Sequence, residues 1–511
     1  MSNLLPSAVK NSSWTAIGSL MTAILGFLFA GLTIRWLGEA EAGFAIAVST
    51  IVGINSTFSG LGLGTAATRK ISRAHAEKNW QEIKAVAGVC LTTSLIFGVV
   101  GLLILAFGSG FILEWSHYKG NTFVGRLYCL LLGSAFLLQQ ISNYFNIFLI
   151  SLQRFDWQTK LNTLFGLANG IIGITLLKTF PSILTLGLMS LGLALLNCLC
   201  TGIVVSRILG FMSRPSWSQP IFNELWSFGK WVYMTQIKVI FFDGVDKLFL
   251  TSVFGSSSLP FYAFAQRIYL TAHGMLVGQS SYLFPMLSAQ GENMESVAGQ
   301  IEDRLRWLIG LLAALIYSGL IIAGPDVLAL IINADFSRKA SFQLFVFSWV
   351  GYIHAQAIIT YFFNFSKGNA KENWAYVMIT GFGYLPVFIC LALLFGFQYA
   401  VLGQLMMLWG VIYLLRQAHG KTRWINFAKW AIKPLLSSIV LMILATTIHF
   451  ILISSSAAIA FQAITLIVFY CGGIAIVYVL ERNLFGGKHR LQTLARAVLI
   501  MGQRLNQSQK T

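Results

Sequence analysis

The chain has 511 residues, of which 56% are hydrophobic and only 10% are charged, and its mean hydropathy is +0.73. Soluble domains carry about 25% charged residues, so this composition excludes an ordinary soluble protein. The formal net charge of +18 would favour a nucleic-acid partner in a soluble protein, but basic loops account for it in a membrane protein. We therefore expect a polytopic membrane protein that binds no nucleic acid.

Apolar runs long enough to cross the roughly 30 Å hydrocarbon core of a bilayer recur along the whole chain. Spanning helices are expected because a membrane barrel would show alternating segments of about ten residues. No small-residue cleavage site follows the first run, so we expect that run to be retained as a helix. The predicted fold is all-α, with about 14 transmembrane helices. They are expected at residues 12–34, 43–65, 85–110, 126–150, 161–178, 182–206, 229–253, 259–286, 305–324, 342–365, 375–396, 399–417, 430–453 and 457–480.

The distribution of Lys and Arg predicts the orientation of these spans. With the N-terminus inside, 26 of the 35 basic residues fall on the cytoplasmic side, six fall on the external side and three lie within spans. Cytoplasmic loops of membrane proteins carry such an excess of basic residues. Both termini are therefore expected in the cytoplasm.

Two hairpins of the chain resemble each other at an offset of 217 residues. Gly38 precedes Phe44 by six residues in the first outer loop, and Gly255 precedes Phe261 by six in the loop between spans seven and eight. This offset maps spans 1–6 onto spans 7–12, as in transporters built from parallel repeats. The predicted organisation is a six-helix lobe at 1–206, a cytoplasmic linker at 207–228, a second six-helix lobe at 229–418, two further transmembrane helices at 419–480 and a basic cytoplasmic tail at 481–511.

The absence of several short catalytic motifs argues against several enzyme classes. The chain contains no GxxxxGK[ST], HExxH or GxSxG sequence, and its external loops are too short to hold a catalytic domain. The glycine-rich segment GLGLGTA at 60–66 follows no strand, so it predicts close helix packing or a hinge rather than a dinucleotide site. Two cytoplasmic segments, 71–84 and 288–306, are predicted as amphipathic surface helices.

The segment KVIFFDGVDKLFL places four charged residues, Lys238, Asp243, Asp246 and Lys247, within predicted span seven. A charge near the centre of a bilayer costs about 2.5–3.5 kcal/mol on insertion scales, so such residues are candidates for function. At helical spacing Asp243 and Lys247 form an i,i+4 pair, and all four charges share one half of the helix. Lys238 has no partner in its own helix, which favours function at that position.

Arg267 in predicted span eight is expected at the depth of Asp246, and Arg35 ends span one. One interpretation is a polar cavity between the two halves, in which cations attract an anionic group and a carboxylate takes an ion. The other interpretation is structural: Asp243–Lys247 and Asp246–Arg267 would be neutral pairs that hold two helices together. The residues alone leave both interpretations open.

Two hairpin stretches follow a recognisable pattern. RWLGEAEAGFAIAVSTIVGINSTFSGLGLGTAATRKIS at 35–72 has an Arg before Leu-Gly, a short acidic turn, Gly-Phe and a Gly-rich second helix. VDKLFLTSVFGSSSLPFYAFAQRI at 245–268 has an acidic-basic pair, an apolar run, a Gly, a short loop and Ala-x-Arg. Over residues 10–420 the chain resembles bacterial O-antigen and lipid-linked oligosaccharide flippases, which share a superfamily with multidrug and toxin extrusion pumps. The family's pair is usually Asp-Arg, whereas this chain has Asp246-Lys247, and Lys acts as a point charge.

The resemblance implies a multidrug-and-toxin-extrusion-like fold in the bacterial inner membrane, with alternating access between two lobes. The implied substrate is a polyprenyl-pyrophosphate-linked oligosaccharide, such as a repeat unit of O-antigen, capsule or exopolysaccharide. Expected partners are membrane lipids, a polysaccharide polymerase and a chain-length regulator. We expect no enzyme activity, no metal and no cofactor other than H⁺ or Na⁺ as a coupling ion. The alternatives are an ion-coupled exporter of small amphiphilic compounds and a lipid II-type flippase.

Uncharged polar residues in the spans add candidates. Gln139, Asn143 and Asn146 share one face of span four, where glycan hydrogen bonding and interhelical packing are equally good interpretations. His273 and His354 could relay protons or make packing hydrogen bonds. A cation exporter would need an acidic cavity, whereas spans one, seven and eight hold four cations against two carboxylates. The expected substrate-binding residues are Arg35, Lys238, Lys247, Arg267, Gln139, Asn143 and Asn146, and the expected ion-coupling residues are Asp243, Asp246 and His354.

Overall fold

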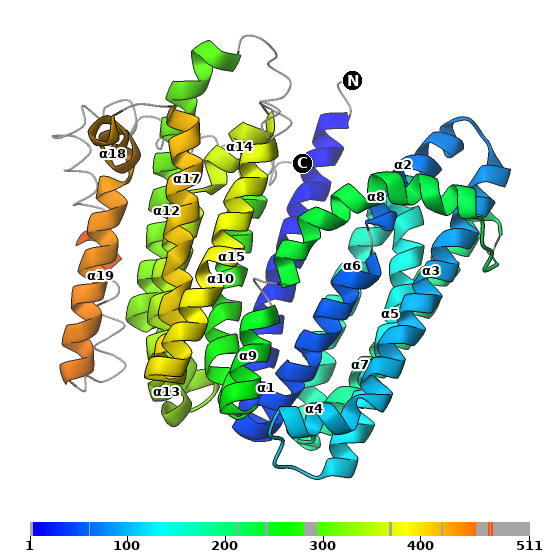
Figure 1. Ribbon diagram of the computed structural model, residues 1–511, viewed down its shortest axis with the longest axis horizontal. Helices are drawn as coiled ribbons and strands as arrows, with labels where there is room; N and C mark the ends of the chain where they lie inside the picture. The colour runs from blue at the N-terminus through cyan, green and yellow to red at the C-terminus, as the bar shows by residue number, and fades with distance from the viewer. Residues whose placement is uncertain are drawn as a thin grey trace. The chain divides into compact units, whose positions relative to one another are not determined.

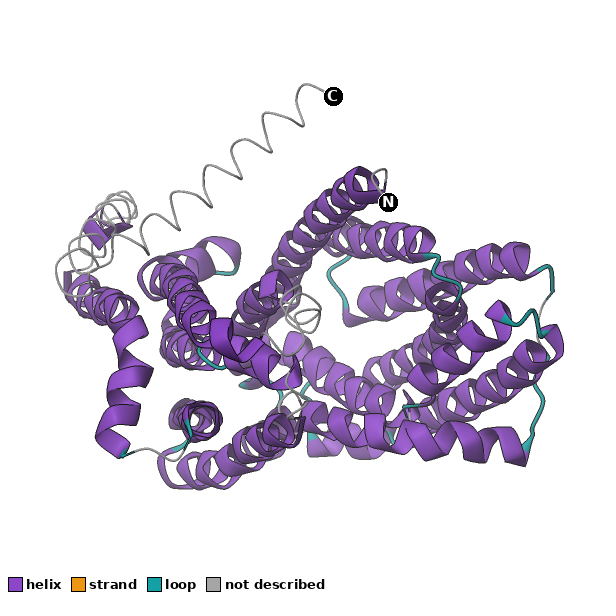
Figure 2. Ribbon diagram, turned by 90° about the horizontal axis from the view of Figure 1, so that it is seen from above, coloured by secondary structure: helices purple, strands orange, loops and turns teal. Residues whose placement is uncertain are grey.

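Helices account for all the regular structure in the described part of the chain (Figure 2). The computed structural model describes residues 4–60, 62–211, 214–240, 244–280, 294–366, 370–420 and 423–455, with five further residues between 465 and 473. Ten helices within these ranges are long and apolar enough to cross a membrane. The predicted all-α, multi-pass fold class is therefore confirmed, whereas the expected total of 14 spans is not. The last expected span, at 457–480, falls mostly outside the described residues, and the tail after 481 falls wholly outside them.

The chain divides into two compact units, and the first comprises Met1–Phe264, Ile331–Asn333 and Ala392–Phe397. The predicted lobe boundaries and the predicted cavity between the lobes stay predictions. The helices that lie wholly in the first unit are α1 (Leu4–Gly60), α2 (Leu63–Ala76), α3 (Trp80–Phe107), α4 (Ser109–Trp115), α5 (Thr122–Ser151), α6 (Phe155–Thr179), α7 (Ile183–Leu209), α8 (Gln219–Ile240) and α9 (Asp246–Phe254) (Figure 1).

The first two predicted spans are one helix, α1, broken at Gly38. Gly38 has φ 81° and ψ 168°, and Gly255, 217 residues later, has φ 79° and ψ 164°. Residues with a Cβ rarely adopt this conformation, so the two glycines place the same bend in the two hairpins. The structure thus confirms the likeness between the hairpins. The hairpins also touch, because a Cβ added to Gly43 would lie 1.7 Å from the carbonyl oxygen of Ser256.

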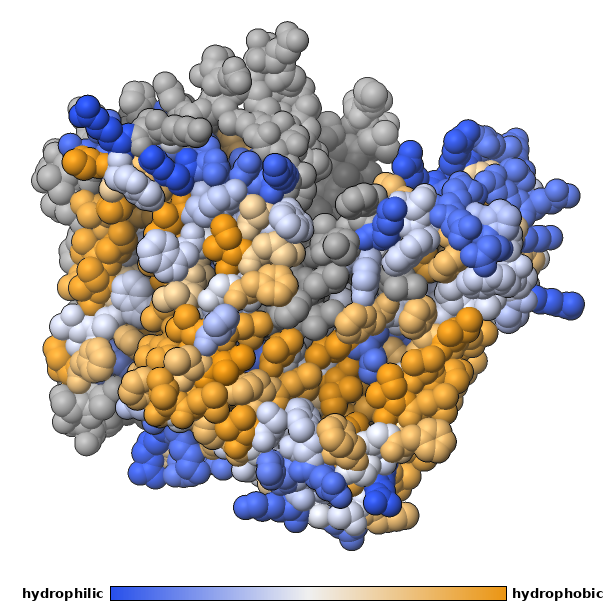
Figure 3. Space-filling model, viewed as in Figure 1, coloured by the Kyte–Doolittle hydropathy of each residue, from blue (hydrophilic) through white to orange (hydrophobic). Residues whose placement is uncertain are grey.

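Glycines let the helices of the first unit pack closely. A Cβ added to Gly170 of α6 would lie 2.8 Å from Cβ of Leu25 in α1, and one added to Gly173 would lie 2.4 Å from the ring of Phe29. Membrane helices associate in lipid through close van der Waals packing, because no hydrophobic driving force acts between them. Small residues allow the close approach that this packing needs. The outward face of α3 is apolar, as expected for contact with lipid, and Figure 3 shows a hydrophobic belt over this unit. The exposed apolar residues of α3 are Ile96, Val99, Val100, Leu103, Ile104 and Phe107.

The prediction of one surface helix at 71–84 is wrong, because the chain turns within it. Helix α2 ends at Ala76, and Lys78 has a positive φ of 55°. Asn79 then caps α3, since its side chain accepts a hydrogen bond from the backbone N–H of Glu82. Only α2 is amphipathic in the expected way, burying residues at helical spacing on one face: Leu63, Ala66, Ala67, Ile71 and Ala74.

Helix α8 begins inside the predicted linker and lies across the ends of α3 and α5 (Figure 1). Lys70 of α2 connects α8 and α3 through two ion pairs. Its Nζ contacts a carboxylate oxygen of Glu224 in α8 and lies 3.5 Å from Oε1 of Glu82 in α3. One cation thereby links three helices at the end of the unit that the charge distribution predicts to be cytoplasmic.

The second unit comprises Ala265–Leu330, Ala334–Leu391 and Gln398–Thr511. The prediction of a separate surface helix at 288–306 is wrong for its described part, because residues from Met294 onward run straight into the membrane helix that ends at Ile331. The α-helices that lie wholly or mostly in this unit are α10 (Leu259–Ser280), α12 (Met294–Ile331), α13 (Ala334–Ala355), α14 (Ile358–Ser366), α15 (Ala370–Phe395), α16 (Phe397–Ala400), α17 (Met407–His419), α18 (Trp424–Ile432) and α19 (Leu436–Ser455), with 3₁₀ helices at Val401–Met406 and Lys433–Leu435.

Candidate substrate and ion sites

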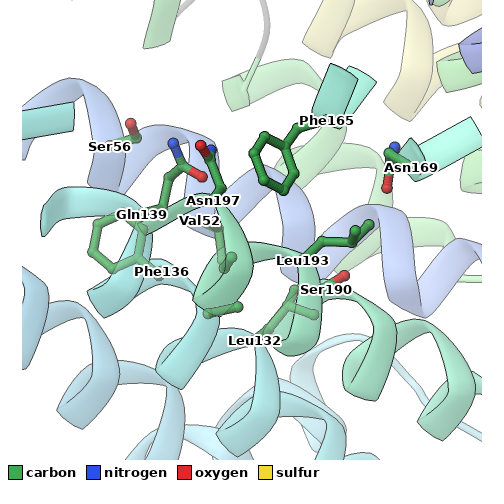
Figure 4. A pocket seen from close by; sticks show the side chains of 12 residues that line it. Val52, Ser56, Leu132, Phe136, Gln139, Phe165, Asn169, Ser190, Leu193 and Asn197 are labelled. Atoms are coloured by element: carbon green, nitrogen blue, oxygen red, sulfur yellow. The ribbon is translucent and has the colours of Figure 1, made fainter. Parts of the chain in front are cut away.

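A cavity of about 360 Å³ opens between four helices of the first unit (Figure 4). Its volume falls within the range of about 300–1,000 Å³ that is typical of small-molecule sites. The lining mixes apolar and uncharged polar side chains and includes no charged residue. The lining residues are Val52 and Ser56 from α1, Leu132, Ala135, Phe136 and Gln139 from α5, Phe165 and Asn169 from α6, and Ser190, Leu193, Ala194 and Asn197 from α7.

Three carboxamides give this pocket its polar character. The side chain of Gln139 donates from Nε2 to Oδ1 of Asn143 at 3.1 Å, and Oδ1 of Asn197 accepts from Thr201 Oγ1 at 3.0 Å. These bonds leave the Gln139 carbonyl and the Asn197 amino group available to a ligand. In Figure 4 the amides of Gln139 and Asn197 lie at the same edge of the pocket, and Asn169 lies beyond the Phe165 ring. The pocket therefore offers both hydrogen-bond donors and acceptors within an apolar frame.

Of the three predicted polar residues on α5, the structure places only Gln139 in this lining. Asn143 is exposed beside it, and Asn146 donates to the backbone oxygen of Ser142 in its own helix at 3.1 Å. The sequence analysis missed Asn169 and Asn197. Each carries a carboxamide inside an apolar span, and that signal could have identified both.

Asp246 is a buried acid of the first unit, with none of its surface exposed. Its Oδ2 accepts a hydrogen bond from Tyr262 Oη at 2.5 Å, and its Oδ1 accepts from the backbone N–H of Lys247 at 2.7 Å. Asp246 is the first residue of α9, and the two residues before it, Gly244 and Val245, are also helical. The carboxylate is thus held by a tyrosine hydroxyl and a backbone N–H, an arrangement that sequence reasoning did not anticipate.

The other predicted charged residues differ in their exposure and in whether the structure describes them. Arg35 is exposed on α1, three residues before the break at Gly38, and Arg267 is exposed on α10. The Asp246–Arg267 pair stays a prediction because the two residues belong to different units. Lys238 lies on α8, but its side chain lies outside the described part of the chain, and so does the whole of Asp243. The predicted Asp243–Lys247 pair is therefore also outside the described residues.

His354 and His273, predicted separately, lie together in the second unit. Their rings stack in parallel, with centroids 4.0 Å apart and planes inclined by 8°. The hydroxyl of Tyr269 lies 2.7 Å from Nδ1 of His354, and the Tyr269 ring stacks on Phe347. The two histidines are 81 residues apart in sequence, so only the packing of α10 against α13 brings them together.

Comparisons with known proteins agree with this architecture. The family described as "Polysaccharide biosynthesis protein" matches residues 8–290, which is more than half of the chain. A search of curated proteins gave no match. A solved structure named "Lipid II flippase MurJ, inward closed conformation" is similar with a TM-score of 0.70 and 14% identity, covering 92% of this chain and 99% of that chain.

Two further solved structures share the fold. An inward-facing multidrug resistance MATE family transporter of the MOP superfamily has a TM-score of 0.56 and 16% identity, covering 85% of this chain and 96% of that one. A MOP superfamily transporter from Pyrococcus furiosus has a TM-score of 0.50 and 13% identity, covering 84% of this chain and 94% of that one. The predicted fold and the predicted family resemblance are confirmed. The chain belongs to the polysaccharide biosynthesis protein family.

Proposed function

We propose that the chain is a flippase that moves a polyprenyl-pyrophosphate-linked oligosaccharide across the bacterial inner membrane. Its family, its series of membrane-spanning helices and the fold it shares with a lipid II flippase and MATE transporters support this function. On this proposal the protein is a transporter rather than an enzyme, and both termini are cytoplasmic. A polymerase and a chain-length regulator would act on the repeat unit that it delivers.

The carboxamide pocket is the observation that carries the proposal. Sugar hydroxyls both donate and accept hydrogen bonds, and the amides of Gln139, Asn169 and Asn197 do the same. Phe136 and Phe165 line the same space and offer apolar surface to the faces of a sugar ring. Low local dielectric strengthens each of these hydrogen bonds relative to water. A pocket of this kind suits a glycan better than it suits a small hydrophobic cation.

The anionic part of the substrate needs cations, and the proposal retains Arg35, Lys238, Lys247 and Arg267 for the pyrophosphate. Among them, Arg35 and Arg267 are exposed and Lys247 is partly buried. Asp246 is retained with Asp243 as a candidate for ion coupling, since a buried carboxylate can take up a proton or Na⁺.

A cell-based export assay with two matched variants tests the proposal. Gln139→Leu removes an amide from the pocket, whereas Gln140→Leu removes one from the next position, which is buried, does not line the pocket and has an unpartnered Nε2. We expect Gln139→Leu to lower surface glycan severalfold and to raise the lipid-linked intermediate inside the cell, with protein amount unchanged. Gln140→Leu should match the wild type. Equal export by both variants would argue against the pocket as a glycan site.

Cells that lack the protein separate the alternative functions. A lipid II-type flippase would leave surface polysaccharide unchanged on deletion and would instead rescue cells that lack their own lipid II flippase. An exporter of small amphiphilic compounds would change drug tolerance without changing either glycan pool. The carboxamide lining favours a carrier that bears a glycan over a small amphiphilic compound.

A further inference from the structure

The membrane helix that carries His354 is interrupted immediately after it. Residues Ala334–Asn364 form one candidate span, yet α13 ends at Ala355 and α14 begins only at Ile358. At the break, the backbone N–H of Ala357 donates to the His354 carbonyl at 3.1 Å. Interrupted helices within a membrane occur where the backbone is buried in protein or lines a site, and in transporters they mark sites for substrates and coupling ions.

The stacked pair of histidines lies at this break. His354 contributes a ring whose Nδ1 lies 2.7 Å from the Tyr269 hydroxyl, and His273 contributes the ring stacked on it at 4.0 Å. Nδ1 of His273 is buried and has no hydrogen-bond partner. A buried polar nitrogen without a partner is costly, so its presence here calls for a function or an additional ligand.

Parallel stacking decides which ligand fits. The lone pairs of an imidazole lie in the plane of its ring, so two parallel rings cannot aim them at one metal ion. The described residues also contain no group of three or more His, Cys, Asp or Glu that could hold one. A proton needs only one nitrogen. The charged ring is then stabilised by the face of the neutral ring beside it, whereas a second proton would place two like charges 4.0 Å apart.

In the part of the chain that the structure describes, tyrosines from four elements pack on or next to the pair. Tyr269 lies on α10 with His273, and the Tyr376 ring of α15 lies 6.3 Å from that of His354. The hydroxyl of Tyr317 from α12 donates to the Tyr269 carbonyl at 3.4 Å, and Tyr361 of α14 packs against Tyr376. Tyrosine stays neutral near physiological pH, so the imidazoles are the members of this cluster that can take up a proton.

We propose that His273 and His354 together bind one proton and that loading of this site couples substrate movement to a proton gradient. The proton comes from water and binds a lone pair on one imidazole nitrogen, which changes the charge of the pair from zero to +1. Release to water reverses the step. Proton binding by the pair stands independently, whereas the coupling rests on the proposed flippase function.

Proton binding can be read directly from imidazole NMR signals of the full-length protein, labelled on histidine and held in lipid nanodiscs. We expect the His273 and His354 signals to respond to pH together, with one proton taken up by the pair, and each response to change when the partner is replaced (His273→Asn or His354→Gln). His449→Asn is the matched control, because His449 is a buried membrane histidine stacked on Phe345 in the same unit. Two independent responses, unaffected by replacement of the partner, would overturn the shared site.

Coupling is tested in vesicles that contain the purified protein, with an imposed pH gradient and a polyprenyl-pyrophosphate-linked oligosaccharide. We expect the gradient to accelerate translocation at least fivefold for wild type and for His449→Asn, and to have no effect on His354→Gln. A His354→Gln protein that still responds like wild type would overturn the coupling. Absence of translocation by wild type, with the NMR result intact, would instead contradict the proposed function and leave the proton site standing.

Discussion

The two units of the molecule carry different polar groups inside their helices. The first unit lines a pocket with the carboxamides of Gln139, Asn169 and Asn197, which keep the same charge at every physiological pH. The second unit stacks His273 on His354, and an imidazole changes its charge near neutrality. On the two proposals above, the carboxamides of the first unit recognise an uncharged part of the substrate, and the histidine pair of the second unit responds to protons.

The largest expected effect comes from overpacking the contact between α1 and α6, two of the helices that line the pocket. Gly170→Leu would force a side chain into the contact between α6 and Leu25 of α1, where a Cβ already has only 2.8 Å. Overpacking of this kind costs about 1–3 kcal/mol, so we expect a lower unfolding temperature and loss of export. Gly192→Leu in α7 is the control, because an added Cβ there meets nothing within 4 Å. Thermal unfolding of the two variants in detergent should differ by several degrees, and equal curves would contradict the packing.

Replacing one pocket amide should have the next largest effect. In Asn197→Leu the ligand loses a hydrogen bond worth about 1 kcal/mol, which corresponds to a fivefold weaker affinity. Calorimetric titration with the free oligosaccharide measures this change. Because the pocket lining carries no charge, the affinity of the wild type should be insensitive to salt and to pH. A steep fall in affinity at high salt would mean that charges, not amides, dominate recognition in the first unit.

A single hydroxyl in the second unit should have a smaller effect, confined to the response to protons. Tyr269→Phe removes the contact of 2.7 Å with His354 Nδ1 but keeps the ring that stacks on Phe347. We expect the pH profile of transport to shift while affinity for the oligosaccharide is unchanged. A change in affinity with an unchanged pH profile would mean that the second unit binds the oligosaccharide and does not respond to protons through this contact.

The smallest effect is expected at the rim of the pocket. Ser56→Ala removes one hydroxyl from α1 and leaves the three carboxamides in place. Transport should fall by less than about twofold, because an exposed hydroxyl exchanges its ligand bond for one to water. Initial rates of translocation in vesicles measure this effect. A larger loss would mean that α1, rather than the three amides, makes the main contact with the substrate.

Regular patterns along the chain predicted the architecture. Apolar runs predicted the membrane helices, and the equal spacing of Gly38 and Gly255 from a following Phe predicted matching hairpins. The structure adds the reason for the glycines, because the bend needs a residue without a Cβ. The ends of surface segments were harder to predict. One residue, Asn79, splits the segment 71–84 into two helices by capping α3, and hydrophobic periodicity does not register such a cap.

The sites depended on contacts between distant parts of the sequence. Gln139 was predicted as a polar residue of one helix, but its partners in the pocket come from three other helices. His273 and His354 were each considered alone, because nothing in the sequence indicates that α10 and α13 would stack them. The pairing of Asp246 with a cation stays a prediction, and the described contacts add the hydroxyl of Tyr262, sixteen positions along the chain.

The most direct test measures translocation of one polyprenyl-pyrophosphate carrier that bears an uncharged oligosaccharide, using vesicles and a lectin that reports glycan on the far side. Wild type and Gln140→Leu should translocate it at the same rate. The double variant Gln139→Leu/Asn197→Leu should be slower by roughly tenfold or more, since two ligand hydrogen bonds are lost, while it keeps the wild-type response to a pH gradient. A double variant that translocates the carrier as fast as wild type would contradict recognition of the glycan by the first unit.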